Sequence, residues 1–456
     1  MVRLFQVYYP VRSLVLLAGE TVVACSSFLV ATFIALGITS TASFESSPAY
    51  KLLAPVAVAI LCSHLFDLYS VRGLLLHGEI YVRVFLAQST MAFLLAGLEY
   101  VWPELLPDNW VLLIGAVIFS IAIVGWRYGF TRLMKHAYLR QRVYVLGGGS
   151  LASELIKTIR EHHNLGFEIV GWAGAVDNGS LGKDELASSV LSLQRLGRID
   201  QVIVALPDRR EKMPVRELLA LRLAGMKVED AHSVLEKVTG RLQIEGLHPS
   251  NIIFSDGFRL NRPLLVVQRG FWVLVSLFIL VACLPLIPFI ALAIKCTSRG
   301  PVLLSQERVG RRGQRFRLYK FRTMRVDAEA DTGPQWTSDN DPRITPLGRF
   351  LRLTRLDEIP QLWNVIKGDM GVVGPRPERP EFVQWLSAAI PYYELRHAVR
   401  PGITGWAQIR YKYAASLEDA RQKLQYDLYY IKHMSLALDL LIMLETAKTI
   451  LFARGR

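Results

Sequence analysis

The chain has 456 residues, of which 52% are hydrophobic, yet 53 Lys and Arg against 39 Asp and Glu leave a formal net charge of +14. Apolar segments that coexist with strongly basic ones indicate a membrane protein that faces anionic lipid or phosphorylated substrates. The chain shows no zinc-finger spacing, basic zipper or RNA-binding aromatic signature, so we expect no nucleic-acid partner. The 4 cysteines are scattered without a CxxC pair, which argues against disulfides and a zinc site.

Residues 1–140 are predicted to form a four-helix transmembrane bundle. Its apolar runs lie at residues 14–38, 52–69, 82–102 and 110–126, and each is close to the roughly 20 residues that cross a bilayer. Basic residues precede the first run and follow the fourth: Arg3, Arg12, Arg127, Arg132, Lys135, Arg140 and Arg142. The positive-inside tendency therefore places both ends of the bundle in the cytoplasm, and we expect a bacterial inner-membrane protein.

Residues 141–262 are predicted to form a Rossmann-like α/β domain. A strand candidate at residues 143–146 leads into the glycine turn at Gly147, and further apolar runs at residues 168–173 and 201–206 predict more strands. A bound dinucleotide would need an acidic residue about 20 positions on, but Asp177 comes late. Two alternatives stay open for this domain: a bound nicotinamide or flavin, or an empty or regulatory module.

Residues 263–296 are predicted to form a re-entrant membrane helix. The apolar run at residues 271–294 is long enough to span a bilayer, but Pro285 and Pro288 interrupt it. If the run crossed, the basic segment after it would lie outside the cell, against the positive-inside tendency. A helix that breaks at Pro285 and returns to the cytoplasmic face satisfies both facts. An ordinary kinked membrane helix is the alternative.

Residues 297–456 are predicted to form a soluble segment that lies against the membrane, organised around the stretch TRLDEIPQLW at residues 354–363. Pro360 fits the first turn of a helix, so Asp357 and Glu358 would lie at its start, where the helix dipole favours the ionised form. Arginines recur every three residues upstream: Arg349, Arg352 and Arg355. Cations beside carboxylates indicate a phosphate site, whereas the alternative is an amphipathic helix with a solvated basic face and a capping acid.

Several other stretches have the composition of anion-binding segments, because prolines and glycines hold their arginines in fixed positions. They are QERVGRRG at residues 306–313, YKFRTM at 319–324, GPRPE at 374–378 and RPGITGWAQ at 400–408. Together with the segment LDEIPQLWNVIKGDMGVVGPRP, they resemble the catalytic domain of the bacterial monotopic phosphoglycosyl transferases, also called initiating sugar transferases. The resemblance covers about residues 268–452 and implies that residues 297–456 form a mainly α monotopic catalytic domain. The parts ahead of it look like the large form of that family.

The resemblance implies transfer of a sugar-1-phosphate from a UDP-sugar to polyprenyl (undecaprenyl) phosphate with release of UMP, as the first membrane step of exopolysaccharide or other glycoconjugate synthesis. Asp357 would be the nucleophile that forms a covalent aspartyl phosphosugar, and Glu358 would hold Mg²⁺. The matching phosphate and nucleotide contacts would be Lys320, Arg322, Arg352, Arg376, Arg396 and Arg400. The catalytic domain would work on the cytoplasmic face of the membrane, and the large form favours a homodimer.

Two other classes of function are weighed against this one. A membrane-bound NAD(P)-dependent nucleotide-sugar oxidoreductase or dehydratase would use the glycine turn at Gly147. A non-catalytic scaffold of polysaccharide export would use Asp357 and Glu358 only as structural acids. The sequence does not select among UDP-glucose, UDP-galactose and N-acetylated hexosamines as donors.

Overall fold

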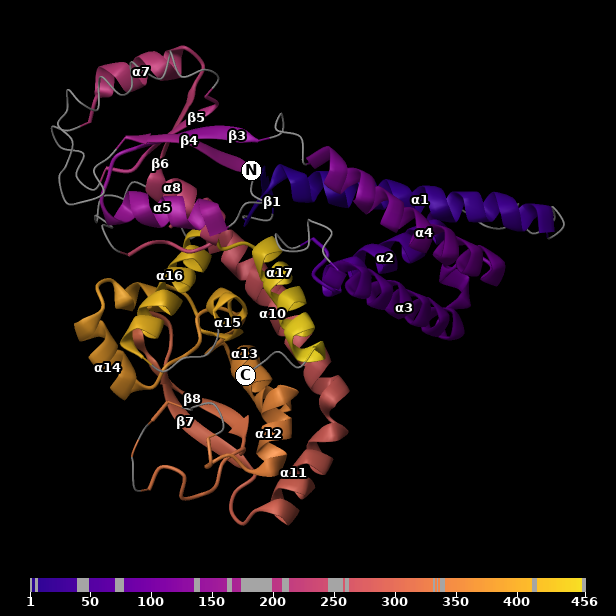
Figure 1. Ribbon diagram of the computed structural model, residues 1–456. Coiled ribbons are helices and arrows are strands. Elements are labelled where there is room, and N and C mark those ends of the chain that lie inside the picture. The colour runs from indigo at the N-terminus through magenta and orange to yellow at the C-terminus, as the bar shows by residue number, and fades with distance from the viewer. Residues whose placement is uncertain are drawn as a thin grey trace. The chain divides into compact units, whose positions relative to one another are not determined.

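The computed structural model describes residues 2–4, 7–38, 49–69, 78–134, 140–161, 166–173, 199–206, 213–244, 257–258, 262–330, 333, 335–336, 341–411 and 416–452. The chain divides into two compact units (Figure 1). The first unit is formed by Met1–Val2 and Tyr9–Val234, and the second by Arg3–Tyr8 and Leu235–Arg456. A short pair of strands near the N-terminus, β1 (Val2–Leu4) and β2 (Val7–Tyr9), forms a sheet of its own.

Apolar helices make up the first part of the first unit. They are α1 (Val11–Ile38), α2 (Leu53–Leu65), α3 (Gly78–Val101) and α4 (Asn109–Met134). Each helix contributes to one core, in which Phe28, Cys62, Met91 and Phe119 are fully buried. By length and composition α1, α3 and α4 are able to cross a membrane. The chain is therefore a membrane protein with an N-terminal helix bundle, as predicted.

The second helix of this bundle is shorter than the sequence suggested. We expected a span over residues 52–69, but α2 has 13 residues and ends at Leu65. The backbone of Asp67 takes a positive φ of 61°, a left-handed conformation that a helix cannot continue. Leu68 is nevertheless fully buried, so the apolar residues beyond Leu65 pack in a turn and not in a helix.

A parallel four-stranded sheet makes up the second part of the first unit, in the order β4-β3-β5-β6. Its strands are β3 (Gln141–Leu146), β4 (Phe167–Ala173), β5 (Gln201–Val204) and β6 (Lys227–Asp230), and its helices include α5 (Ser150–Glu161) and α7 (Val215–Leu223). Gly147 ends β3 with φ +127°, and a Cβ there would lie 2.3 Å from the carbonyl oxygen of Ala205. The glycine turn thus exists because two strand ends approach closely. Asp177 lies outside the described residues.

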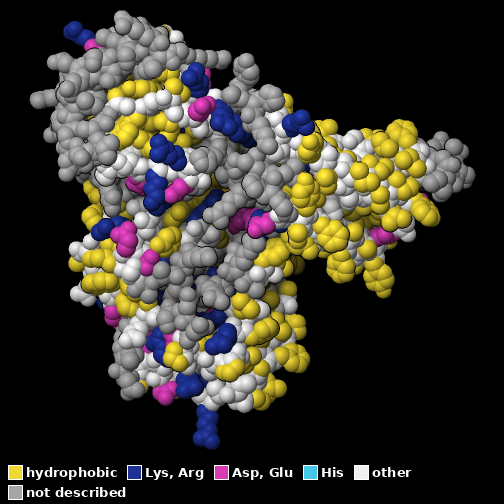
Figure 2. Space-filling model, in the orientation of Figure 1, with side chains coloured by type: hydrophobic (Ala, Val, Ile, Leu, Met, Phe, Trp, Pro, Cys, Tyr) yellow, Lys and Arg dark blue, Asp and Glu magenta, His cyan; other side chains and the backbone are white. Residues whose placement is uncertain are grey.

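The second unit begins with α8 (Ala231–Thr239), which starts in the first unit, and a helix pair, α10 (Arg262–Cys283) and α11 (Leu286–Thr297). The helical conformation is interrupted between α10 and α11 at Leu284 and Pro285, as the sequence predicted for Pro285. Apolar side chains such as Leu274, Phe278 and Phe289 are exposed along the pair, and Figure 2 shows hydrophobic side chains gathered on this edge. The helix α10 is long and apolar enough to cross a membrane, whereas α11 has 12 residues.

The rest of the second unit is mostly helical around two small sheets. Its elements are β7 (Leu303–Val309), η7 (Arg311–Gly313), β8 (Arg315–Phe321), α12 (Pro346–Leu353), η8 (Leu356–Glu358), α13 (Gln361–Lys367), β9 (Gly371–Val373), α14 (Pro380–Ala389), η9 (Tyr393–Ala398), β10 (Gly402–Thr404), α15 (Trp406–Arg410), α16 (Leu417–His433) and α17 (Leu436–Leu451). The strands β7 and β8 pair antiparallel, and β9 and β10 pair parallel.

One apolar core joins the broken helix pair to the rest of the second unit. Ile290 and Ile294 of α11 are buried in the same cluster as Phe321 at the end of β8 and Leu362 of α13. Burial of a side chain of this size contributes roughly 1.5–3 kcal/mol. The second half of the helix pair is therefore attached firmly to the elements that carry the predicted site.

Candidate active site

A cavity of about 480 Å³ in the second unit brings most of the predicted site residues together. Six of them line it: Lys320, Arg352, Asp357, Glu358, Arg376 and Arg396. We call it the acid-pair cavity. Its lining holds nine Lys and Arg, namely Arg308, Lys320, Arg349, Arg352, Arg355, Arg376, Arg379, Arg396 and Lys423, but only six Asp and Glu. The surplus of positive charge suits a ligand with several negative charges, such as a diphosphate.

The acid pair lies on a tight turn between two helices. The helix α12 begins at a Thr345 cap, whose hydroxyl oxygen accepts a hydrogen bond from the Gly348 backbone N–H at 3.0 Å. After α12 the backbone of Arg355 is left-handed, with φ 59°, which is a strained conformation for a side chain of this size. Asp357 and Glu358 follow on η8 and are both buried. Pro360, predicted in the first turn, is the N-cap of α13.

A buried asparagine holds this turn against the strand that carries Lys320. The Asn364 side chain is fully buried on α13; its amide donates to the Arg317 carbonyl oxygen at 2.7 Å, and its oxygen accepts from the Tyr319 backbone N–H at 3.2 Å. These bonds connect α13 to β8 directly. Sequence reasoning did not single out Asn364, because nothing local shows which backbone a side-chain amide will meet.

Burial and charge act on Asp357 in opposite directions. Burial and, next, the charge of the neighbouring Glu358 raise the pKa of Asp357 to about 6, although Lys320, Arg352 and Arg376 oppose the rise. Burial also lowers the pKa of Lys320 to about 7, with Arg308 and Arg352 acting in the same direction. Asp357 is therefore ionised near neutral pH while it is poorly hydrated, which is the state of a reactive nucleophile.

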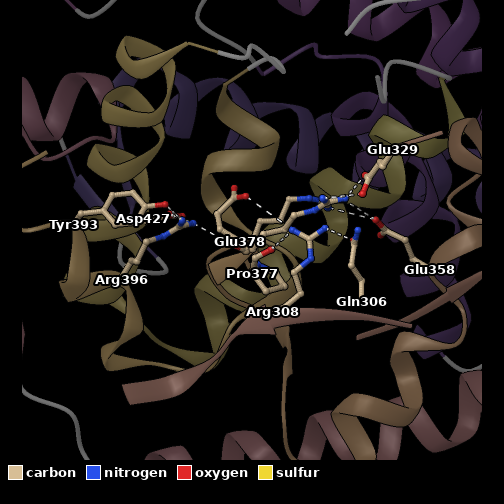
Figure 3. A network of polar contacts seen from close by, with 11 residues as sticks. Gln306, Arg308, Glu329, Glu358, Pro377, Glu378, Tyr393, Arg396 and Asp427 are labelled. Atoms are coloured by element: carbon tan, nitrogen blue, oxygen red, sulfur yellow. Dashed lines mark hydrogen bonds and ion pairs between the residues drawn. The ribbon is translucent and has the colours of Figure 1, made fainter. Parts of the chain in front are cut away.

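Glu358 is held by two arginines on either side. Arg355 donates to both Glu358 carboxylate oxygens at 3.4 Å, and Arg376 donates to Oε1 through both terminal nitrogens at 3.3 Å. Figure 3 shows Glu358 at one end of the polar network that runs through the cavity. These contacts are long for charge-assisted hydrogen bonds, so a stronger partner is able to displace them.

Arg396 lies at the other end of this network (Figure 3) and contacts the backbone of Arg376. Its guanidinium donates to Asp427 at 2.8 Å and to the Tyr393 hydroxyl at 2.6 Å. It also donates to the Arg376 backbone carbonyl at 3.0 Å. Because these partners hold the guanidinium group of Arg396 in place, its hydrogen bond to the carbonyl fixes the backbone position of Arg376.

Two predicted substrate contacts lie outside the lining of the acid-pair cavity. Arg322 donates to the Arg299 carbonyl at 2.8 Å, to the Ser298 carbonyl at 2.9 Å and to the Ser298 hydroxyl at 2.8 Å, so it fastens the end of α11. Arg400 donates through Nε to the Gly368 carbonyl at 3.0 Å and lines a different cavity. The structure thus separates these two arginines from the other six predicted residues.

Some cavity residues were not singled out from the sequence. Arg308 lies in the QERVGRRG segment, but its own role was not predicted. Its guanidinium donates to the Gln306 side chain at 2.6 Å and to the Pro377 carbonyl at 3.1 Å. Arg379 pairs with Glu329, and Lys423 comes from α16. Arg379 directly follows the GPRPE segment, which was the available signal, whereas no local pattern marks Lys423. A larger hollow of about 890 Å³ in this unit contains none of the predicted site residues.

Comparison with known proteins agrees with this site. Residues 264–453 match the family model described as Bacterial sugar transferase. A UDP-N-acetylgalactosamine-undecaprenyl-phosphate N-acetylgalactosaminephosphotransferase of Aeromonas hydrophila is 42% identical over 53% of this chain and 56% of its own length. A UDP-glucose:undecaprenyl-phosphate glucose-1-phosphate transferase of Klebsiella pneumoniae is 35% identical over 70% of this chain and 69% of its own. One of the same name from Xanthomonas campestris pv. campestris is 29% identical over 98% and 96%.

The buried acid pair and the basic cavity lie within the part of the chain that matches this family model. The chain belongs to the bacterial sugar transferase family. It spans a little over half the length of the Aeromonas relative.

Proposed function

We propose that the protein transfers a sugar-1-phosphate from a UDP-sugar to undecaprenyl phosphate, through a covalent intermediate on Asp357. The observation that carries the proposal is the buried Asp357 and Glu358 pair inside a cavity with nine basic residues. The names of the relatives support a UDP-sugar donor and an undecaprenyl-phosphate acceptor.

In the first step, a carboxylate oxygen of Asp357 attacks the phosphorus that carries the sugar. The bond between that phosphorus and the bridging oxygen breaks, and the bridging oxygen leaves with UMP, which takes the electron pair. Lys320, Arg352 and Arg376 surround Asp357 electrostatically and would neutralise the diphosphate charge that otherwise repels a carboxylate. Attack therefore becomes feasible only with the donor held among these cations.

In the second step, a phosphate oxygen of undecaprenyl phosphate attacks the aspartyl phosphorus. The acyl-phosphate bond breaks, the Asp357 carboxylate is restored, and the lipid diphosphate sugar is released. No net proton or redox change is needed, so the same cations serve both steps.

Magnesium fits this site through Glu358. Among the residues that the structure describes, no group of three or more His, Cys, Asp or Glu side chains could enclose a metal ion. Mg²⁺ commonly takes only one or two carboxylates and completes its shell with substrate phosphates and water. Glu358, whose arginine contacts are long, would hold it beside the donor diphosphate. Bound there, the ion would supply charge neutralisation and orientation of phosphate oxygens.

We also propose that α10 and α11 form a re-entrant membrane element at the cytoplasmic face of the inner membrane. The break at Pro285, the exposed apolar side chains and the basic residues Arg269 and Lys295, which flank the apolar run at residues 271–294, support this. Cysteine-labelling accessibility in membrane vesicles tests it: positions 269 and 295 should both react from the cytoplasmic side. Labelling of position 295 from outside would contradict the re-entrant topology.

The parallel sheet supports a Rossmann-like assignment for residues 141–262, because its central strand ends in a glycine turn. We propose that this module is not the catalytic part of the protein. We expect the purified full-length protein to carry no stoichiometric NAD(P). A stoichiometric NAD(P) cofactor would instead favour the oxidoreductase alternative.

The deciding experiment follows UMP release from solubilised full-length protein with Mg²⁺, undecaprenyl phosphate and a panel of UDP-sugars. Because the relatives' names specify different sugars, the panel includes UDP-glucose, UDP-galactose and both UDP-N-acetylhexosamines. Asp357→Asn should abolish UMP release, while Asp327→Asn, an exposed carboxylate outside the cavity lining, should not. A labelled protein adduct in the absence of lipid would support the covalent step. Equal UMP release from both variants would overturn the proposal.

A further inference from the structure

A second cavity in the same unit has a different size and lining from the acid-pair cavity. Its volume is about 70 Å³, and its lining shares no residue with that of the acid-pair cavity. This volume is roughly that of two molecules of liquid water, whereas whole small-molecule ligands occupy roughly 300–1,000 Å³. The second cavity therefore suits one small charged group and not a nucleotide sugar.

Three arginines from separate elements meet at this second cavity, which we call the arginine cavity. Arg269 lies on α10, Arg311 on η7, and Arg400 follows η9. Arg311 donates through Nε to the Ala398 carbonyl at 3.3 Å, as Arg400 does to Gly368. The two anchoring bonds use only Nε, so the terminal N–H groups are left for a ligand.

Arg269 lies against the same backbone segment as Arg400. A Cβ built on Gly368 would lie 2.7 Å from Nη2 of Arg269, so the guanidinium covers the residue whose carbonyl binds Arg400. In the described part of the chain, no carboxylate forms an ion pair with Arg269, Arg311 or Arg400. The pKa of Arg400 is lowered by burial, and next by the charges of Arg269 and Arg311. Three positive charges thus repel one another around a small space.

The one acid at this cavity does not relieve that repulsion. Asp439 is buried on α17, and its carboxylate accepts hydrogen bonds from the Trp272 ring N–H at 2.8 Å, the Tyr430 hydroxyl at 2.9 Å and the Gln268 amide. Three neutral donors therefore satisfy Asp439 inside the protein. An anion that neutralises the arginines would therefore come from outside the protein.

The surroundings of Arg269 indicate where such an anion would come from. On the same helix the side chains of Val266, Val267 and Leu274 are exposed, and α10 is apolar enough to lie in a membrane. Arg269 comes just before the apolar run at residues 271–294, which places it near the headgroup level if that run enters a membrane. We propose that Arg269, Arg311 and Arg400 bind the phosphate group of a membrane lipid, at a site separate from the cavity that holds Asp357.

Two lipids carry this chemistry, an anionic phospholipid and the polyprenyl phosphate itself. The test uses solubilised full-length protein and native mass spectrometry, with phosphatidylglycerol, undecaprenyl phosphate and inorganic phosphate as probes. The variant Arg269→Gln/Arg400→Gln is compared with Arg312→Gln/Arg315→Gln, which removes the same charge from neighbouring positions outside the lining. Loss of two charged hydrogen-bond donors should weaken lipid binding at least about tenfold in the first variant only.

Competition identifies the lipid. Phosphatidylglycerol that stays bound when undecaprenyl phosphate is added identifies a phospholipid site, and its displacement identifies an acceptor site. The Asp357→Asn variant should bind the lipid as the wild type does. Lipid binding can therefore be tested even if the proposed transferase chemistry is wrong. Equal weakening in both double variants, or binding of inorganic phosphate alone, would overturn the proposal. Arg311→Gln provides a second variant if the double variant does not fold.

Discussion

Two groups of charged residues in this protein are built in opposite ways. In the helix bundle, Arg127 contacts Glu20 at 2.5 Å, and the Tyr69 hydroxyl donates to the same carboxylate at 2.6 Å. One positive and one negative charge balance inside the fold. In the acid-pair cavity, nine basic residues face six acids, and the balance is left to a ligand. Charges that are paired inside a fold hold a structure together, whereas a surplus of positive charge around a cavity marks a site where an anion binds.

The largest effect that we expect in the acid-pair cavity is the loss of UMP release in the Asp357→Asn variant. UMP release should fall by a factor on the order of 10⁴ or more, because the nucleophile is lost. Stability should not fall: burial raises the pKa of Asp357 to about 6, above its value in the unfolded chain, so the ionised form disfavours folding near neutral pH. Thermal unfolding at pH 7.5 should show an equal or higher Tm than for the wild type. A large drop in Tm would mean that Asp357 is a structural acid.

Arg127→Gln should instead lower the stability of the protein and leave its chemistry intact. Removing one partner leaves Glu20 charged and buried, which costs about 3–5 kcal/mol, while the chemistry of the second unit should persist in whatever protein remains folded. The double variant Glu20→Gln/Arg127→Gln should recover part of the loss, because no lone charge is left. Denaturant titration in detergent measures both. A double variant less stable than Arg127→Gln would contradict a balanced pair.

The pH dependence of kcat/KM sharpens the account of the cavity. The carboxylate must be ionised to attack, so activity should decline as the pH falls through about 6. Lys320 must be protonated to neutralise phosphate, so activity should also decline as the pH rises through about 7. Lys320→Arg should remove only the alkaline decline, because a guanidinium stays charged. If kcat/KM of that variant still declines at high pH, the decline belongs to a group other than Lys320.

Arg322→Gln gives the smallest expected change in catalysis. Its guanidinium hydrogen bonds go to Ser298 and Arg299, so we expect a lower Tm and a KM for the UDP-sugar within about twofold of the wild type, since no substrate contact is removed. Thermal unfolding and initial-rate measurements on the same preparation separate these effects. A large rise in KM without a change in Tm would restore the substrate role that the family resemblance implied.

Local patterns predicted the elements of this protein well where the cause is local. The proline break at Pro285, the glycine turn at Gly147 and the acid pair on its turn are all present, because φ restrictions and close backbone approaches act within a few residues. The second bundle helix was predicted too long, since hydropathy alone does not show the left-handed turn at Asp67.

Side-chain direction was much harder to predict. Arg322 lies in the YKFRTM segment, and Arg352 belongs to the arginine series before the acid pair. Arg352 lines the acid-pair cavity, whereas the Arg322 side chain points to the end of α11. The choice depends on carbonyl groups that only the tertiary fold brings near. Lys423 could not be found at all from the sequence, because it reaches the cavity from a helix far along the chain.

The shared core of Ile290, Ile294, Phe321 and Leu362 has a mechanical consequence. It makes the second half of the helix pair and the turn that carries Asp357 parts of one rigid body. The height of Asp357, the proposed nucleophile, above a bilayer would then follow the depth at which α11 lies in it. An enzyme built in this way would reach the phosphate of its proposed lipid acceptor at one level of the membrane surface, without moving the lipid tail.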